Sequence, residues 1–395
     1  MINLTTLLSG ESQPADYLRY GRGHGAPKTA GERRPIVVWN ITRSCNLKCL
    51  HCYSDSDAKS YAGELDWDQC KAVVDDLAAY GVPGLLLSGG EPLAHPQVFK
   101  LADYAKSKGL RLTLSTNGTL ITPDKAVLIK QIGFAYVGIS LDGIGSTHDH
   151  FRGRKGAFDL AVNAFRHCRA AGQRVGLRLT LTKHTIGDIE GILEFIEKEN
   201  IDRVCFYHLV NSGRGADLAA VTHDDTRHAI DTIMAKVKYW HQTGQKREVL
   251  TVAQPADGPY LLLKLAEENS PRLNEVRQLL QWNGGGNNGP GIGIANIDSQ
   301  GNVHPDQFWQ GLTLGNVKEK PFSEIWGQST DPVLLGLRNR RAKLQGRCQR
   351  CTWQEICGGG FRVRAWQHHG DPWQEDPGCY LNEEEIAQAS AEVSS

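Results

Sequence analysis

The sequence predicts an α/β protein: an open, partial (β/α)6 barrel of the TIM-like kind, followed by a small C-terminal domain rich in cysteine. Three observations support this fold class. Short apolar runs alternate with amphipathic helical stretches from residue 35 to about 245, and this unit occurs six times. The alternation stops near residue 245, and four of the ten cysteines lie between 348 and 379. Six units fall short of the eight that close a TIM barrel.

The six predicted strands are short and apolar, as strands covered by helices on one face should be. They span residues 35–41, 84–89, 110–116, 136–142, 174–182 and 203–210. Between them, apolar residues recur at helical spacing, for example at Cys70, Val73 and Leu77. Repeated β-then-α units form a parallel sheet with right-handed crossovers, so the carboxyl ends of all six strands should meet at one rim.

The chain divides into three predicted parts. Residues 1–34 are polar and rich in glycine and indicate an irregular N-terminal arm, and residues 35–245 form the barrel. Residues 246–395 form a C-terminal extension with a hairpin at Gly301-Asn302 and helices near 258–281, 321–326, 331–345 and 382–394.

Composition restricts the possible partners and the compartment. Lys and Arg number 44, as do Asp and Glu, so no basic field favours nucleic acid or membrane phospholipid. The N-terminus lacks the charged and apolar regions of a signal peptide, and no apolar stretch approaches 18 residues. We therefore expect a cytoplasmic protein, in which clustered cysteines are metal ligands more often than disulfides.

Three cysteines directly follow the first predicted strand, in the sequence Cys45-Asn-Leu-Lys-Cys49-Leu-His-Cys52-Tyr53. Three thiolates on one loop can ligate three irons of a cubane cluster and leave the fourth iron open. A zinc site with His51 as the fourth ligand is the alternative on spacing alone.

Polar residues and glycines stand at the ends of the next three strands. The second strand ends in Ser88-Gly89-Gly90-Glu91-Pro92, the third in Thr116-Asn117-Gly118 and the fourth in Ser140-Leu-Asp142-Gly143. Each is an ordinary turn by itself. Stacked along one rim of a parallel sheet, they predict a polar ligand site beside the cysteine loop.

A second group of cysteines has the spacing C-x2-C-x5-C followed by a distant fourth: Cys348, Cys351, Cys357 and Cys379. Four thiolates fully ligate either an iron–sulfur cluster or a structural zinc ion, and the spacing alone leaves both open.

The C-x3-C-x2-C loop, with His51 before the last cysteine, and Gly-Gly-Glu-Pro in the expected order resemble the radical S-adenosylmethionine (SAM) superfamily. The resemblance covers nearly the whole chain and implies an enzyme in which Cys45, Cys49 and Cys52 hold a catalytic 4Fe–4S cluster. It also implies that SAM binds the open iron and is cleaved to a 5′-deoxyadenosyl radical. The residues it assigns to SAM binding are His51, Tyr53, Gly89, Gly90, Glu91, Pro92, Thr116, Asn117, Ser140 and Asp142.

The C-terminal cysteines resemble the SPASM/Twitch domains attached to such barrels, and this likeness favours an auxiliary 4Fe–4S cluster over zinc. Full SPASM domains carry a further cysteine after a G-x-v-x-P stretch, where this chain has Gly301-Asn-Val-His304-Pro305-Asp306. We therefore expect one auxiliary cluster.

Four segments resemble the heme d1 biosynthesis radical SAM family (NirJ): VVWNITRSCNLKCLHCY, FYHLVNSGRG, GIANIDSQGNVHPDQFW and CGGGFRVRAW…DPGCYL. The resemblance implies removal of propionate side chains from didecarboxysiroheme, a siroheme-derived tetrapyrrole, with electrons from a flavodoxin- or ferredoxin-type donor. An anionic substrate needs cationic anchors, because guanidinium pairs carboxylates in a bidentate manner. The candidate substrate contacts are Arg152, Arg214, His304, Arg362 and Arg364.

Three alternatives stay open at this point. One is a radical SAM decarboxylase of iron-coproporphyrin in heme biosynthesis, and another is a peptide-modifying SPASM maturase. The third, from a different class, is an iron–sulfur sensor or electron carrier, which would have no need of an open iron beside a Gly-Gly-Glu-Pro loop.

Overall fold

The computed structural model describes residues 1–13, 15–20, 33–284 and 289–387. Within these, one sheet of eleven strands has the order β1-β8-β7-β6-β5-β4-β3-β2-β9-β10-β11. The strands are β1 (Ile2–Asn3), β2 (Ile36–Asn40), β3 (Leu85–Ser88), β4 (Leu112–Thr116), β5 (Tyr136–Ser140), β6 (Val175–Leu181), β7 (Arg203–His208), β8 (Glu248–Val252), β9 (Ile294–Ile297), β10 (Asn302–His304) and β11 (Gly315–Asn316).

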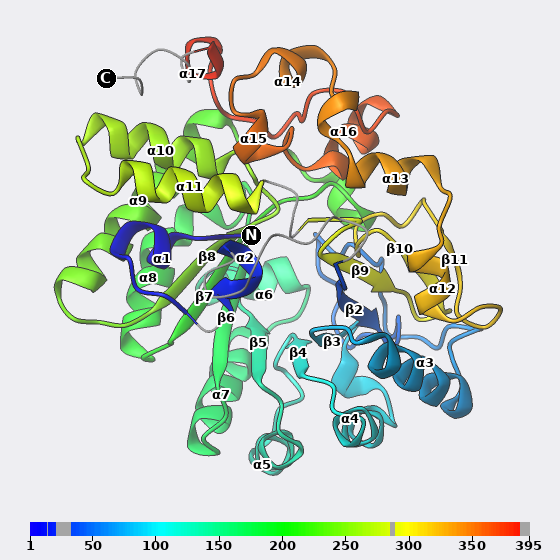
Figure 1. Ribbon diagram of the computed structural model, residues 1–395. Helices are drawn as coiled ribbons and strands as arrows, with labels where there is room; N and C mark the ends of the chain where they lie inside the picture. Colours follow the sequence, from blue (N-terminus) through cyan, green and yellow to red (C-terminus); the bar gives the residue numbers. More distant parts are fainter. Residues whose placement is uncertain (14, 21–32, 285–288, 388–395) are drawn as a thin grey trace.

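The six predicted strands correspond to β2 through β7, and all of them pair in parallel. The helices between them are α3 (Trp67–Tyr80), α4 (Val98–Ser107), α5 (Pro123–Ile132), α6 (Ser146–Arg152), α7 (Ala157–Ala170) and α8 (Ile189–Lys198). Figure 1 shows α3, α4, α5 and α7 on the outer side of the curved sheet. The sheet does not close, because β1 and β11 are its two edges. The predicted fold class, an open partial barrel, is confirmed.

Two strands outside the predicted barrel segment extend the parallel sheet. β8 pairs in parallel with β7, and β9 pairs in parallel with β2, although both lie after residue 245. The predicted hairpin at Gly301-Asn302 is present as β9–β10, and its first strand is part of the main sheet. The barrel strands therefore continue past the predicted 35–245 segment.

The N-terminal segment is more ordered than the predicted irregular arm. β1 pairs antiparallel with β8, with Ile2 opposite Thr251, and α1 (Leu4–Ser9) and α2 (Asp16–Tyr20) follow it. Asn3 begins α1 as its N-cap, since its side-chain oxygen accepts from the Thr6 amide. The segment thus covers the edge of the sheet that β8 would otherwise expose.

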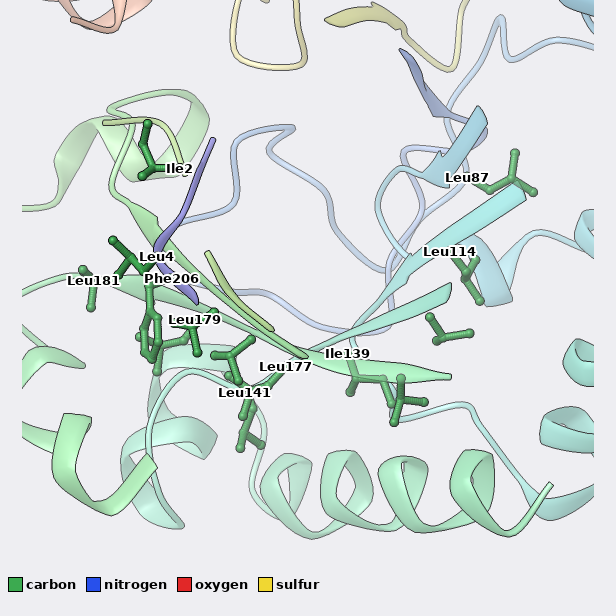
Figure 2. Packing of buried hydrophobic residues seen from close by; sticks show 14 of the residues in the cluster. Ile2, Leu4, Leu87, Leu114, Ile139, Leu141, Leu177, Leu179, Leu181 and Phe206 are labelled. Carbon is green, nitrogen blue, oxygen red and sulfur yellow. The ribbon is translucent and has the colours of Figure 1, made fainter. Parts of the chain in front are cut away.

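Side chains alternate between the two faces of the strands. Ile139, Leu141 and Leu177 are buried and point toward the helices, as Figure 2 shows. On the opposite, inner face, Arg178 of β6 donates from Nη1 to Ser115 Oγ of β4 at 2.8 Å. A Cβ at Gly138 would lie 2.3 Å from Arg178 Nε, so the glycine leaves room for that side chain inside the barrel.

Helices dominate the C-terminal part of the chain. They are α9 (His223–Gln242), α10 (Asp257–Glu267), α11 (Leu273–Asn283), α12 (Phe322–Gly327), α13 (Pro332–Arg338), α14 (Gly346–Arg350), α15 (Gln354–Cys357), α16 (Arg362–His369) and α17 (Glu383–Ala387). The single helix predicted at 258–281 is two helices, α10 and α11, separated by a turn in which Asn269 has a positive φ of 51°. Residues 388–394 of the predicted tail helix lie outside the described residues.

The cysteine-rich segment packs over the carboxyl ends of β7 and β8. Arg364 of α16 donates to the carbonyl of Ala253, directly after β8, at 2.7 Å, and Figure 1 shows α14, α15 and α16 above one rim of the sheet. Both cysteine groups therefore stand at the rim where the sequence places the ligand site.

Candidate active site

The first three cysteines lie on the loop between β2 and α3. Cys45 and Cys49 are buried and Cys52 is half-buried beside them. Backbone amides point at two of the sulfurs: Leu47 N lies 3.4 Å from Cys45 Sγ, and Ser56 N lies 3.4 Å from Cys52 Sγ. Arg152 Nη1 lies 3.6 Å from Cys49 Sγ. Such donors stabilise sulfur that carries negative charge, as thiolates and cluster sulfurs do.

These donors fit a metal cluster better than free thiols. Burial raises the pKa of the Cys45 thiol to about 12 and also raises that of Cys49. Without iron both residues are protonated at neutral pH, so ligation releases their protons. A cubane cluster, when bound here, would supply the electron that cleaves SAM.

A cavity lies directly above this loop and is called here the cysteine-loop cavity. Of the residues predicted to bind SAM, seven line it: His51, Tyr53, Gly89, Gly90, Thr116, Asn117 and Ser140. Cys45, Cys49, Cys52 and Arg152 line it as well. The structure therefore brings the strand-end residues and the cysteine loop together, as the parallel sheet required.

The two glycines allow β3 to end against the cysteine loop. Gly90 N donates to the Thr42 carbonyl at 2.8 Å, and Glu91 N donates to the Ser44 carbonyl at 2.9 Å. A Cβ on Gly89 would lie 2.3 Å from the Thr42 oxygen, and one on Gly90 would lie 2.3 Å from the Ser44 oxygen. Only glycine permits this approach of two backbones.

Glu91 and Pro92 do not line the cavity, contrary to their predicted role. The Glu91 carboxylate is fully buried and accepts from Thr116 Oγ1 at 2.7 Å and from Asn117 N at 2.8 Å. Burial raises the pKa of Glu91, although these hydrogen bonds oppose that shift. Glu91 therefore positions two cavity residues, Thr116 and Asn117.

Asp142, also predicted to contact SAM, lies behind the wall of the cavity. It is fully buried, forms an ion pair with Arg152 and accepts from the Thr180 amide at 2.6 Å. Burial alone would raise the pKa of Asp142, but the charge of Arg152 and the hydrogen bond from the Thr180 amide outweigh it, and the net pKa is lowered. Burial lowers the pKa of His51 to about 4, so its ring is neutral.

Arg152 was predicted as a substrate contact, and the structure places it on the wall of the cysteine-loop cavity instead. Its guanidinium joins the Asp142 carboxylate to the Cys49 sulfur. Asp142 stands at the end of a predicted strand and Arg152 lies ten residues further on. This spacing alone does not reveal that the two residues pair.

The other four predicted substrate contacts form hydrogen bonds with other residues of the chain. Arg214 donates from Nε to the Cys49 carbonyl at 2.9 Å and thereby stabilises the cysteine loop. His304 is buried and donates from Nδ1 to the Leu312 carbonyl at 2.7 Å. Arg362 is buried, donates to the carbonyls of Pro372 and Gln374, and lies 3.9 Å from Cys348 Sγ.

Arg364, the last of these four, also lines an open space. It forms a buried ion pair with Asp376 at 2.8 Å, and its side chain is part of a cavity between the strand ends and α16. This space, called here the interface cavity, was not anticipated from the sequence, because its walls come from segments as distant as Leu181, His208 and Gly378.

The second cysteine group encloses a cavity of its own, lined by all four predicted ligands, Cys348, Cys351, Cys357 and Cys379. Cys357 ends α15, and the three glycines after it all have left-handed backbone conformations. Burial raises the pKa of the Cys379 thiol to about 11. This C-terminal cysteine cavity shares His223 and Pro377 with the interface cavity.

Zinc and a cluster differ in the spacing of their ligands. A single zinc ion gathers four thiolates at about 2.3 Å from one point, whereas a cubane offers each thiolate its own iron. Among the described residues, no group of three or more His, Cys, Asp or Glu side chains is arranged to hold one metal ion.

Comparisons with known proteins agree with this site. Residues 39–196 match the radical SAM superfamily model, and residues 291–352 match the SPASM iron–sulfur cluster-binding domain. Solved structures of the same fold include Streptococcus suis SuiB bound to S-adenosylmethionine, with a TM-score of 0.68 and 18% identity over 88% of this chain and 78% of that chain. Another is anSMEcpe with bound AdoMet, with a TM-score of 0.67 and 19% identity over 87% and 94% of the two chains. The chain belongs to the radical SAM superfamily: it is an enzyme that uses SAM and iron–sulfur clusters.

Its curated relatives narrow the family further. The chain is 45% identical to the Fe-coproporphyrin III synthase of Methanosarcina barkeri over 99% of this chain and 100% of that protein. It is 42% identical to the pre-heme d1 synthase of Dinoroseobacter shibae over 91% and 89% of the two chains, and 31% identical to the AdoMet-dependent heme synthase of M. barkeri over 87% and 95%. The chain is therefore a member of the radical SAM heme-synthesis family. No helix in the described part of the chain is long and apolar enough to cross a bilayer.

Proposed function

We propose that this enzyme removes carboxylate-bearing side chains from a siroheme-derived iron tetrapyrrole by radical chemistry. In this proposal Cys45, Cys49 and Cys52 hold the SAM-cleaving cluster, and the residues of the cysteine-loop cavity bind SAM. The four C-terminal cysteines hold the auxiliary cluster. A carboxylate side chain has no activated C–H bond, so its cleavage needs a radical as reactive as the one SAM provides.

The position of the interface cavity supports it as the binding site for the tetrapyrrole in this proposal. It lies between the two cysteine sites: it shares two residues with the C-terminal cysteine cavity, and Asn211 on its wall begins the loop that packs on the first cysteines. On that loop Arg214 N donates to the Cys52 carbonyl at 3.0 Å. A large substrate seated here would lie within reach of both sites.

The relatives support two products. Similarity over the full length of both proteins favours Fe-coproporphyrin III as the first candidate. Pre-heme d1, which the resemblance to the heme d1 biosynthesis family predicts, is the second and is supported by a relative at 42% identity. Decarboxylation of iron-coproporphyrin, as an AdoMet-dependent heme synthase, has weaker support at 31% identity.

Mass spectrometry of anaerobic reactions separates these products. The reconstituted protein is incubated with SAM and reductant, together with didecarboxysiroheme in one reaction and iron-coproporphyrin in another. We expect side-chain loss from didecarboxysiroheme, with the mass of Fe-coproporphyrin III or of pre-heme d1. Vinyl products from iron-coproporphyrin would move the enzyme to the heme synthases, and 5′-deoxyadenosine without change in either pigment would refute a tetrapyrrole substrate.

We propose further that the enzyme works in the cytoplasm and receives its electrons from a flavodoxin- or ferredoxin-type donor. A comparison of the rate of 5′-deoxyadenosine formation with reduced flavodoxin, reduced ferredoxin and dithionite tests the donor. Turnover with dithionite alone would reject both proteins as donors.

A further inference from the structure

The interface cavity has walls suited to an anion. Its polar residues are three histidines, one arginine, three amides and one threonine: His208, His223, His368, Arg364, Asn211, Gln254, Gln367 and Thr226. No aspartate or glutamate is among the described residues that line it. The remaining lining residues are small or apolar, such as Leu181, Ile186 and Val221. The cavity therefore fits an apolar body that bears carboxylates and would disfavour a cation.

His208, the last residue of β7, is the best-supported polar group in this cavity. Its side chain is 8% exposed, and its Nε2 lies 3.1 Å from Asp257 Oδ2. Because a carboxylate only accepts, Nε2–H is the donor. The other ring nitrogen, Nδ1, has no hydrogen-bond partner among the described residues.

Asp257 is itself held from the other side. It is buried at the start of α10, and its Oδ1 accepts from the Tyr380 hydroxyl at 2.7 Å. Tyr380 directly follows Cys379, and its ring packs edge-on against Tyr260 at 5.2 Å between centroids. The imidazole thus has a fixed orientation, set by α10 and by the C-terminal cysteine segment.

We infer that His208 anchors a carboxylate side chain of the tetrapyrrole in the interface cavity. This inference rests on the proposed function. With hydrogens on both ring nitrogens, the imidazole donates from Nε2 to Asp257 and from Nδ1 to the ligand, and its positive charge lies between two carboxylates. Arg364 cannot take this role, because its guanidinium is bound to Asp376, Gln254 and the Ala253 carbonyl.

Anchoring at His208 would fix one edge of the substrate at the end of β7. The loop that begins at the interface cavity also contacts Cys52. Gly213 on this loop packs so closely that a Cβ there would lie 2.3 Å from the Cys52 carbonyl. In this proposal the carboxylate at His208 stays on the ring as the anchor, and a different side chain faces the radical.

Absorbance titration of the full-length, reconstituted protein tests the anchor without any turnover. The probes are iron-coproporphyrin, which has free carboxylates, and its tetramethyl ester, which has none. We expect His208→Phe to weaken binding of the free acid about 10- to 100-fold, the size of a charge-assisted hydrogen bond, and to change binding of the ester less than about 2-fold. His208→Gln, which keeps a neutral donor, should fall between the two.

His369→Gln is the matched control, because His369 is exposed next to the cavity but does not line it. It should bind the free acid as the wild-type protein does. Equal weakening of acid and ester by His208→Phe, or no weakening of the acid, would overturn the anchor while the proposed function stands. If the wild-type protein binds neither probe, the anchor fails, and the proposed function is decided separately by the reaction with didecarboxysiroheme.

Discussion

The contact between the end of β3 and the cysteine loop leads to a sharp test at Gly90. In Gly90→Ala the new methyl carbon would lie 2.3 Å from the Ser44 oxygen and 2.6 Å from the Arg43 oxygen. Both obstacles are backbone atoms and cannot rotate away. An ordinary carbon–oxygen contact requires the loop to retreat by about 1 Å, and overpacking of this kind costs about 1–3 kcal/mol of the free energy of unfolding.

The larger effect should fall on the chemistry. A shift of about 1 Å at a reacting centre costs on the order of 10²-fold in rate, so 5′-deoxyadenosine formation should drop by that factor. Gly187→Ala is the control: a Cβ there meets nothing within 4 Å, and Gly187 has no positive φ. A wild-type rate of 5′-deoxyadenosine formation in Gly90→Ala would refute the reasoning.

Four further outcomes follow from the site. Cys49→Ala should abolish SAM cleavage and retain the auxiliary iron, which metal analysis and 5′-deoxyadenosine assays measure; unchanged turnover would reject the assignment. Cys357→Ala should lose the auxiliary iron and keep substrate-free SAM cleavage, and full iron retention would show that it is no ligand. Asp142→Asn removes the charged partner of the buried Arg152 guanidinium. It should lower the free energy of unfolding, measured by urea titration, by about 3–5 kcal/mol. A loss below about 1 kcal/mol would contradict the buried ion pair. Burial lowers the pKa of His148 to about 4, so as the pH falls from 7 to 5 only the unfolded chain binds a proton at this residue, and the free energy of unfolding should drop by about 2 kcal/mol. His148→Asn should lose that part of the pH dependence, measured by urea titrations at several pH values. An unchanged dependence of the free energy of unfolding on pH would contradict the lowered pKa.

The sequence predicted the barrel and its rim because those features are local. Each strand is an apolar run of its own, and parallel pairing then brings Gly89, Thr116 and Ser140 to one edge without further information. β8 was not predicted, and β9 was predicted only as part of a hairpin, for the opposite reason. They follow a change in the pattern of the chain, and only their pairing with β7 and β2 shows that they belong to the sheet.

The internal partners of charged residues could not be predicted from the sequence. From the sequence, Arg214 and Arg364 are candidate partners for the carboxylates of the substrate. In the fold, Arg214 binds a carbonyl of the cysteine loop, and Arg364 is neutralised by Asp376. The same limit hid His208, whose significance depends on Asp257, a residue 49 positions away.

The strand order also has a consequence for synthesis of the chain. β2, which leads into the first cysteine loop, has β3 on one side and β9 on the other, and β9 is translated some 250 residues later. β1 likewise has no partner strand until β8 has been translated, since Ile2 pairs with Thr251. Until the ribosome has passed residue 297, the growing sheet has open edges, which other chains could join. The sheet beside the first cysteine loop is thus complete only late in translation.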